Sequence, residues 1–184
     1  MQLLLASSSP RRRELITQIT TDFQVEPSLF EESAKGLSAY DTARTFAKGK
    51  AEEVAGRFPE ALVLGADTVV CLDGEILGKP KNAAKAREML LSLSGRTHTV
   101  YTGVCVVCRG VSRTRVVSSQ VTFHTLSDDL IERYIQSGQP LDKAGAYGIQ
   151  DGFPIVERYE GSFTNIVGLP VEETRELIEQ ALSE

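Results

Sequence analysis

Residues 61–80, ALVLGADTVVCLDGEILGKP, restrict the fold more than any other segment of the chain. Two apolar runs flank Asp73-Gly74, a dipeptide that favours the tight turn of a β-hairpin. Further along, Thr97–Cys108 and Thr114–His124 are rich in β-branched residues and predict a second, longer hairpin. Because hairpins join antiparallel strands, we expect a sheet that contains antiparallel pairs.

Helical segments are interspersed among these strands, and each begins near a residue that can cap it, such as Asn82 or Ser127. The predicted helices are Pro10–Ile19, Ser38 to Arg57, Asn82 to Gly95, Ser127 to Gly138 and the segment after Pro170. The further predicted strands are Leu3–Ala6, Phe23–Pro27, Ile155–Tyr159 and Phe163–Val167. This mixture predicts an α/β fold with a mixed sheet. No repeat, linker or clean boundary interrupts residues 1–184, so we expect a single domain made of two closely joined lobes.

The charge and cysteine content exclude several classes of protein. A formal net charge of −5 argues against general affinity for nucleic acids or anionic membranes. No apolar run approaches the roughly 18 residues of a membrane span. Cys71, Cys105 and Cys108 are too sparse for a disulfide framework, and we interpret them as core thiols. We expect a cytoplasmic protein.

Three consecutive arginines, Arg11–Arg13, follow the helix-capping pair Ser9-Pro10. The N-terminus of a helix has a positive partial charge, which repels cations. A bound anion would remove the conflict, since helix N-termini and guanidinium groups both bind phosphate oxygens. The alternative is a surface helix whose arginines are solvated or paired with acids such as Glu14. We favour the anion site, although three successive helical positions cannot all reach one ligand.

Asp67 interrupts the most apolar stretch of the chain. A carboxylate in such a strand needs a partner, a metal ion or a cleft. The alternative is a turn aspartate at a bend marked by Gly65, but the apolar residues on both sides indicate a continuous strand. We therefore interpret Asp67 as an active-site residue.

Glu32, Lys50 and Lys79 would each be read alone as a solvated surface residue. Together with Asp67 and the arginines they supply cations that neutralise phosphates and hard oxygen ligands suited to Mg²⁺ or Mn²⁺. Hydrolysis of a phosphate ester or anhydride uses this set of groups.

The segment Asp142 to Gln150, DKAGAYGIQ, is rich in small residues that allow a flat ligand to approach the backbone closely. The amide of Gln150 presents a donor and an acceptor side by side, which can match N3–H and O4 of uracil or thymine. A Gly-rich structural loop is the alternative. His98 and His124 lack the spacing of metal ligands.

Several segments in a fixed order resemble the Maf family of nucleoside triphosphate pyrophosphatases. They are LLLASSSPRRREL, KGKAEEVA, VLGADTVVCLDGEILGKP, LSGRTHTVYTGV, LDKAGAYGIQ and SFTNIVGLP, which together extend over almost the whole chain. Within the family, GADTVV and DKAGAYGIQ resemble the subgroup that acts on dTTP and UTP. The subgroup that prefers 7-methyl-GTP has a GSD-type motif instead.

The resemblance implies a hydrolase that cleaves a nucleoside triphosphate, including modified pyrimidine nucleotides, between the α and β phosphates with a divalent cation, Mg²⁺ or Mn²⁺. It implies an elongated, inosine-triphosphatase-like α/β fold with a mixed sheet, flanking helices and a deep central cleft. It also implies these roles: Asp67 as general base with Lys50 and Lys79 as catalytic cations, Arg11, Thr68 and Gln150 as specificity residues, Ser8 and Arg12 as phosphate ligands, and Glu32 and Asp67 as metal ligands.

Two alternatives stay open from the sequence. Asp67 could serve mainly as a metal ligand, with another group activating the water. The chain could also be a nucleotide-binding regulator of septum formation without turnover, as an older link of the family to septation suggests. The family's usual role is the removal of noncanonical nucleotides, a house-cleaning function in nucleotide metabolism. The sequence permits a homodimer.

Overall fold

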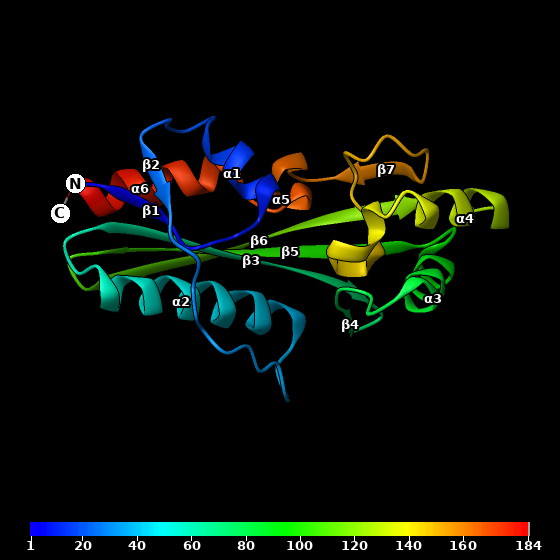
Figure 1. Ribbon diagram of the computed structural model, residues 1–184, viewed down its shortest axis with the longest axis horizontal. Coiled ribbons are helices and arrows are strands. Elements are labelled where there is room, and N and C mark those ends of the chain that lie inside the picture. Colours follow the sequence, from blue (N-terminus) through cyan, green and yellow to red (C-terminus); the bar gives the residue numbers. More distant parts are fainter. Residues whose placement is uncertain (184) are drawn as a thin grey trace.

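The computed structural model describes residues 1–183 and has the elongated α/β architecture expected from the sequence (Figure 1). Its helices and strands are β1 (Leu3–Leu5), α1 (Pro10–Ile16), β2 (Phe23–Val25), α2 (Ala39–Arg57), β3 (Leu62–Leu72), β4 (Glu75–Leu77), α3 (Ala83–Leu93), β5 (Thr97–Cys108), β6 (Val111–Phe123), α4 (Asp128–Gln136), η1 (Gln139–Asp142), η2 (Ala144–Ala146), β7 (Val156–Glu160), α5 (Phe163–Val167) and α6 (Val171–Ser183).

One mixed sheet of seven strands runs along the whole molecule, in the order β2-β1-β3-β5-β6-β7, with β4 also paired to β3. β1 is parallel to both of its neighbours, whereas the other pairs are antiparallel, as the hairpins require. The long strands β3, β5 and β6 extend from one end of the molecule to the other (Figure 1). They therefore contribute to both ends of the elongated molecule.

The edge of β3 that faces β1 has a gap in its pairing. β1 pairs with Leu62–Leu64, and β4 pairs with Val70–Leu72 on a later part of the strand. Residues 65–69 lie between these two partners and pair only with β5. Side chains of a strand alternate between the two faces of the sheet, yet consecutive residues of this segment line one and the same cleft. This gap is where Asp67 and Thr68 lie.

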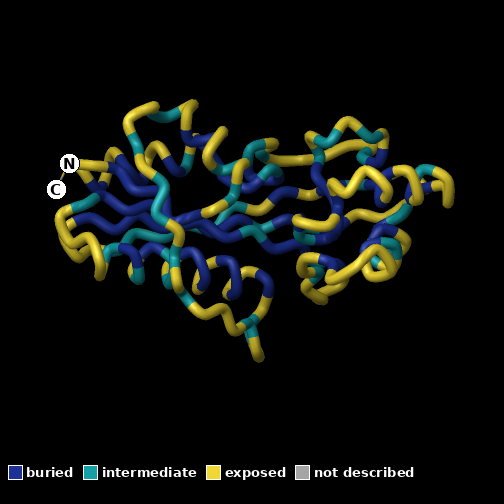
Figure 2. The backbone as a smooth tube through the Cα atoms, viewed as in Figure 1, coloured by how far each residue is buried: buried dark blue, intermediate teal, exposed yellow. Residues whose placement is uncertain are grey.

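The first lobe buries both faces of the sheet, as the dark central strands in Figure 2 show. Leu62 and Leu64 point toward α1 and α6, where they pack with Ile16 and Leu177. Val63, next to them in the strand, points to the opposite face and packs against α2. This alternation explains why β3 is an almost continuous apolar run, since neither of its faces meets water.

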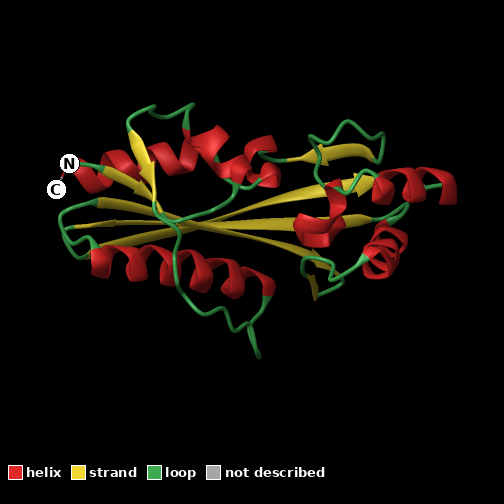
Figure 3. Cartoon of the chain, viewed as in Figure 1, coloured by secondary structure: helices red, strands yellow, loops and turns green. Residues whose placement is uncertain are grey.

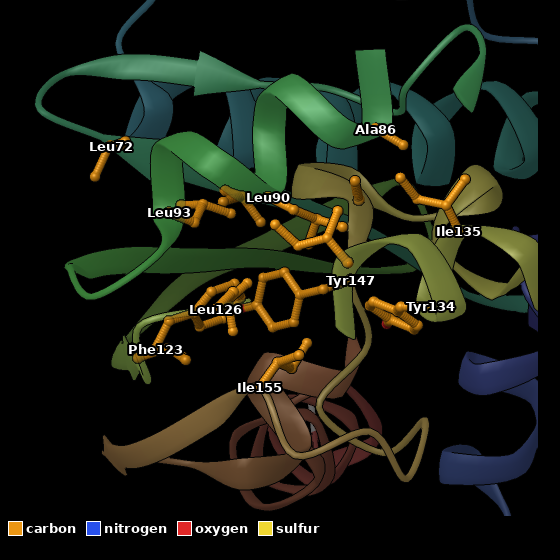
Figure 4. Close-up of a cluster of buried hydrophobic side chains, with 14 of the residues drawn as sticks. Leu72, Ala86, Leu90, Leu93, Phe123, Leu126, Tyr134, Ile135, Tyr147 and Ile155 are labelled. Carbon is orange, nitrogen blue, oxygen red and sulfur yellow. The ribbon is translucent and has the colours of Figure 1, made fainter. Parts of the chain in front are cut away.

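The second lobe has its own apolar core between α3, α4, η2 and the ends of the long strands. Figure 4 shows the side chains of this cluster, among them Leu90, Phe123, Tyr134, Tyr147 and Ile155. Tyr147 also lines the cleft between the lobes. The packing of this core therefore fixes the Gly-rich segment that forms one wall of the cleft.

Helix α2 lies unusually close to the sheet because two strand residues opposite it are glycines. A Cβ atom added at Gly65 would lie 2.5 Å from the carbonyl oxygen of Ala47, and one at Gly103 would lie 2.1 Å from that of Ala43. Gly103 is the β5 partner of Asp67. This close approach brings α2, and with it Lys50, within reach of the Asp67 carboxylate.

Gly103→Ala is expected to lower the free energy of unfolding by about 2 kcal/mol, because backbone atoms of α2 must move to admit the methyl group. The same displacement should move Lys50 away from the Asp67 carboxylate. Gly56→Ala is the matched control, since nothing lies near its added Cβ and alanine favours the helix. Denaturant unfolding of the two variants measures the difference, and equal stability would contradict the close-packing argument.

Several boundaries, most of them by one or two residues, and one assignment differ from the sequence prediction. Helix α1 ends at Ile16 rather than Ile19, and β6 begins at Val111 rather than Thr114. The prediction that Phe163–Val167 is a strand is wrong, because these residues form helix α5 (Figure 3). Ser162 caps this helix by accepting a hydrogen bond from the backbone N–H of Asn165, and Gly168, with a φ of 136°, ends it. These local capping signals prevail over the β-propensity of the short apolar run.

The three cysteines are free thiols, with Cys105 and Cys108 buried and Cys71 partly buried. No helix within residues 1–183 combines the length and the apolar composition needed to cross a membrane.

Candidate active site

A cleft of about 420 Å³ lies between the lobes, at the gap in the β3 edge. The first lobe contributes α1, α2 and the loop before α2, and the second contributes the end of β4 and the Gly-rich segment. Of the residues predicted from the sequence, the cleft is lined by Arg11, Arg12, Glu32, Lys50, Asp67, Thr68, Lys79 and Gln150. Ser8 is exposed and is not among the lining residues, whereas its neighbour Ser9 is.

Arg11 and Arg12 reach the cleft from the first turn of α1, but Arg13 does not line it. Ser9 caps the helix, with its hydroxyl accepting a hydrogen bond from the backbone N–H of Arg12. Arg11 forms an ion pair with Asp142 of η1, at 3.1 Å, which links the two lobes. The geometry agrees with the argument that three successive helical residues cannot all reach one ligand.

The Arg12 guanidinium is held by acceptors on two elements. Its Nε donates to the carbonyl oxygen of Gly168 at 2.8 Å, and its Nη2 donates to the Thr68 hydroxyl at 3.0 Å. Burial lowers the pKa of Arg12, while the nearby carboxylates of Asp67 and Glu32 oppose this shift. An arginine stays charged despite such a shift, so the cleft contains a fixed, partly desolvated cation.

Two carboxylates converge on the ammonium group of Lys50. Its Nζ lies 2.7 Å from Asp67 Oδ1 and 2.6 Å from Glu32 Oε1. Asp67 belongs to β3, Lys50 to α2 and Glu32 to the loop before α2. Three separate elements therefore bring one cation and two anions together at the centre of the cleft.

The loop that carries Glu32 is fixed by contacts with α2. The ring of Phe30 occupies the space above Gly49, where an added Cβ would lie 2.3 Å from a ring carbon, and it packs edge-on against Phe46. The Ser28 hydroxyl and the Leu29 backbone N–H both donate to the carboxylate of Glu53. These anchors hold Glu32 beside Lys50.

Asp67 lies in a desolvated position, with its side chain 13% exposed. Burial raises the pKa of this carboxyl group, and the charges of Lys50 and Arg12 limit the rise. A carboxylate whose pKa is shifted toward neutrality is a better proton acceptor than a solvated one. The geometry and the electrostatics both make Asp67 the strongest candidate for acid–base chemistry in the cleft.

Lys143 lines the cleft as well, although the sequence analysis did not select it from its Gly-rich segment. Its Nζ is enclosed by the carbonyl oxygen of Gln139 at 2.6 Å and the carboxylates of Asp142 and Asp151 at 3.0 Å and 3.4 Å. Asp151 also accepts a hydrogen bond from the Tyr134 hydroxyl. This network holds the turn that carries Gln150. A lysine in an otherwise small and apolar run was the only available signal.

Among residues 1–183, His, Cys, Asp and Glu nowhere form a group of three suited to a metal ion. Glu32 and Asp67 nevertheless direct carboxylate oxygens at one point, which the Lys50 ammonium group occupies. Mg²⁺ is commonly held by one or two protein carboxylates together with substrate phosphates and water. The residues present fit a divalent cation of that kind.

The Maf-like protein family model matches residues 2–181 of the chain. A dTTP/UTP pyrophosphatase of Moorella thermoacetica is 48% identical over 96% of this chain and 93% of its own length. The dTTP/UTP pyrophosphatases of Myxococcus xanthus and Vibrio cholerae are 50% and 47% identical, over 97% and 96% of this chain and 92% and 96% of their own lengths. The solved structure of the Staphylococcus aureus Ham1 protein aligns with 67% of this chain and 71% of its own, at 17% identity and a TM-score of 0.46. The chain belongs to the Maf family.

Proposed function

We propose that this protein hydrolyses dTTP and UTP between the α and β phosphates, releasing the nucleoside monophosphate and pyrophosphate. The observation that carries the proposal is the buried carboxylate of Asp67, paired with Lys50 in a cleft rich in cations. Triphosphate hydrolysis needs a proton acceptor and several fixed positive charges, and this cleft contains both. The names of the relatives support the same reaction and the same two nucleotides.

In this mechanism the cations of the cleft bind and orient the triphosphate. We assign Arg12 to the phosphates, with Ser8 at the same helix start, and Lys50 and Lys79 to the charge that develops as the anhydride bond breaks. Arg12 and Lys50 are already held in place by hydrogen bonds, so little reorganisation is needed when the reaction proceeds.

Asp67 is proposed to accept a proton from the attacking water. The water oxygen bonds to phosphorus on one side of the α–β anhydride, and the bridging oxygen leaves with the other fragment. The positive charge of Lys50, 2.7 Å away, keeps the carboxylate ionised against the effect of burial, so the base is ready to act. General-base catalysis of this kind contributes about 10²–10⁴-fold in rate.

Glu32 and Asp67 would hold the divalent cation, Mg²⁺ or Mn²⁺, which when bound supplies further neutralisation of the phosphate charge.

The specificity residues are proposed to be Arg11, Thr68 and Gln150. Gln150 lies on an exposed turn at the rim of the cleft, where its amide can meet the edge of a pyrimidine. Arg11 lies at the opposite wall and is tied to Asp142 across the cleft. The free thiols of the three cysteines support a cytoplasmic location for this activity.

Incubation of the purified protein with each common nucleoside triphosphate and Mg²⁺ or Mn²⁺ tests the proposal. We expect pyrophosphate from dTTP and UTP and at least tenfold less from the other nucleotides, with all turnover lost when EDTA removes the cation. Equal turnover of purine nucleotides would agree with the proposed hydrolysis but contradict the assignment of Gln150 as a specificity residue for pyrimidines. Tight nucleotide binding without product would favour the septation regulator, and inorganic phosphate as the first product would contradict cleavage between the α and β phosphates.

A further inference from the structure

We propose that Thr102, a fully buried residue of β5 outside the cleft, is a positioning residue that orients Arg12 and Thr68 for the substrate. The inference rests on the proposed function, since it concerns the same cleft. Thr102 is 0% exposed and is not among the lining residues. It acts through its hydroxyl, which lies between a specificity residue and the backbone of α5.

A chain of hydrogen bonds starts at Arg12 and ends inside the protein. Arg12 Nη2 lies 3.0 Å from Thr68 Oγ1, and Thr68 Oγ1 lies 2.9 Å from Thr102 Oγ1. Thr102 Oγ1 in turn donates to the carbonyl oxygen of Asn165 at 2.9 Å. Each neighbouring pair is within ordinary hydrogen-bond distance, so the chain is continuous.

The two ends of the chain fix its direction. A guanidinium group can only donate, and a carbonyl oxygen can only accept. Thr102 uses its single hydrogen on the Asn165 carbonyl, so the Thr68 hydroxyl must donate to Thr102 and accept from Arg12. The hydrogen of Thr68 is therefore directed away from the cleft. Toward a substrate, Thr68 can present only a lone pair.

The far end of the chain is immobile because Asn165 is fixed. Its side chain is 0% exposed, and its Nδ2 donates to the carbonyl oxygen of Val100 and to the Ser119 hydroxyl. These bonds tie α5 to β5 and β6. The next residue after α5 is Gly168, whose carbonyl oxygen accepts from Arg12 Nε at 2.8 Å. The same short helix thus fixes the two acceptors that lie nearest to the Arg12 guanidinium, whereas the Ser7 hydroxyl accepts from Nη1 at 3.5 Å.

Loss of the Thr102 hydroxyl would release this arrangement. The Thr68 hydroxyl could then rotate away from β5, toward the Gly168 carbonyl oxygen at 3.5 Å. Its lone pair would no longer be held toward Arg12 Nη2, so the guanidinium would lose one of its fixed acceptors. Since Arg12 is assigned to phosphate binding, the expected effect is on the KM for the nucleotide rather than on kcat.

The experiment compares Thr102→Val with Thr102→Ser and with Thr174→Val. Valine keeps the shape of threonine and removes the hydroxyl, whereas serine keeps the hydroxyl. Thr174 is the matched control, because it is also 0% exposed and donates to a backbone carbonyl, that of Pro170, but lies in α6 away from the cleft. Thr102→Val is expected to raise the KM for dTTP about tenfold with kcat within threefold, while Thr102→Ser and Thr174→Val stay within threefold of the wild type in both constants.

A purely structural role for Thr102 gives a different result. If the hydroxyl only stabilises the fold, part of the protein would be unfolded. The apparent kcat would then fall and KM would stay unchanged, and Thr174→Val would show the same pattern. That outcome, or a Thr102→Val enzyme with a KM within twofold of the wild type, would overturn the proposal. Failure of Thr102→Ser to retain a wild-type KM would also overturn it.

Hydrogen exchange of the Arg12 Nε–H, observed by NMR without substrate, provides a readout that does not depend on turnover. Exchange should be at least tenfold faster in Thr102→Val than in the wild type and unchanged in Thr174→Val. If the wild-type protein releases no pyrophosphate, the proposed function fails, and this measurement still decides the positioning role. Equal exchange rates in all three proteins would overturn it.

Discussion

Asp67→Asn is expected to lower kcat for dTTP about a thousandfold, near the middle of the range for loss of a general base. Asparagine has the shape of aspartate but does not accept a proton at neutral pH, and it weakens the binding of any cation shared with Glu32. The fold should persist, because Lys50 keeps its partner Glu32 and a buried carboxylate is replaced by a neutral group. Steady-state pyrophosphate release and thermal unfolding measure the two effects.

The same variant separates the two roles that the sequence leaves open for Asp67. If the carboxylate serves mainly as a metal ligand, raising the Mg²⁺ or Mn²⁺ concentration should restore much of the lost kcat. If it is the base, saturating metal should leave kcat low. Asp129→Asn is the control, since Asp129 is exposed on α4 and pairs only with its neighbour Arg133 among the described contacts. Turnover of Asp67→Asn close to that of the wild type would exclude both roles.

The strands of the two hairpins and the unusual position of Asp67 could be predicted from the sequence because their signals are local. A β-hairpin is encoded by a turn dipeptide between apolar runs, and Asp73-Gly74 does join β3 to β4. A charged residue in an apolar strand is anomalous wherever that strand lies in the fold. Asp67 does lie within the continuous strand β3.

The gap beside Asp67 could not be predicted, since it depends on the order of the strands in the sheet. The parallel insertion of β1 next to β3, ending at Leu64, leaves the following residues without a partner on that edge. Nothing in residues 61–80 encodes where a strand from the start of the chain will stop. The presence of Asp67 and Thr68 at one cleft, despite their opposite directions in the strand, follows from that tertiary pairing.

The ion pairs of the cleft could not be predicted from the sequence either. Glu32, Lys50 and Asp67 come from three separate elements, and the distances between them depend on the close approach of α2 that Gly65 and Gly103 allow. A glycine in a strand indicates close packing only once the partner is known. The proposed role of Thr102 could not be predicted from the sequence, because threonine is common in strands and only the structure identifies the partners of its hydroxyl.

Folding stability is expected to fall by about 3 kcal/mol as the pH drops from 6.5 to 4, through His98 alone. Burial lowers the pKa of His98 from its ordinary value of 6.5 to about 4. The imidazole is 2% exposed and lies against the rings of Phe123 and Tyr147, with its Nε2 bonded to the Tyr147 hydroxyl at 2.6 Å. Its Nδ1 has no hydrogen-bond partner in the described part of the chain. A charged imidazole would therefore be poorly solvated in the fold.

The direction of the pH effect follows from the proton balance of the two states. Between pH 6.5 and 4 the unfolded chain binds a proton at His98 and the folded chain does not, so lower pH favours unfolding. Above pH 6.5 the contribution is fully present, and below about pH 4 its loss is complete. His98→Gln should therefore flatten the pH profile of the unfolding free energy between pH 6.5 and 4. Urea unfolding at several pH values measures the profiles of the wild type and of His98→Gln. Identical profiles for His98→Gln and the wild type would mean that the imidazole is charged or solvated in the folded protein, and that the core beneath Tyr147 is not closed around it.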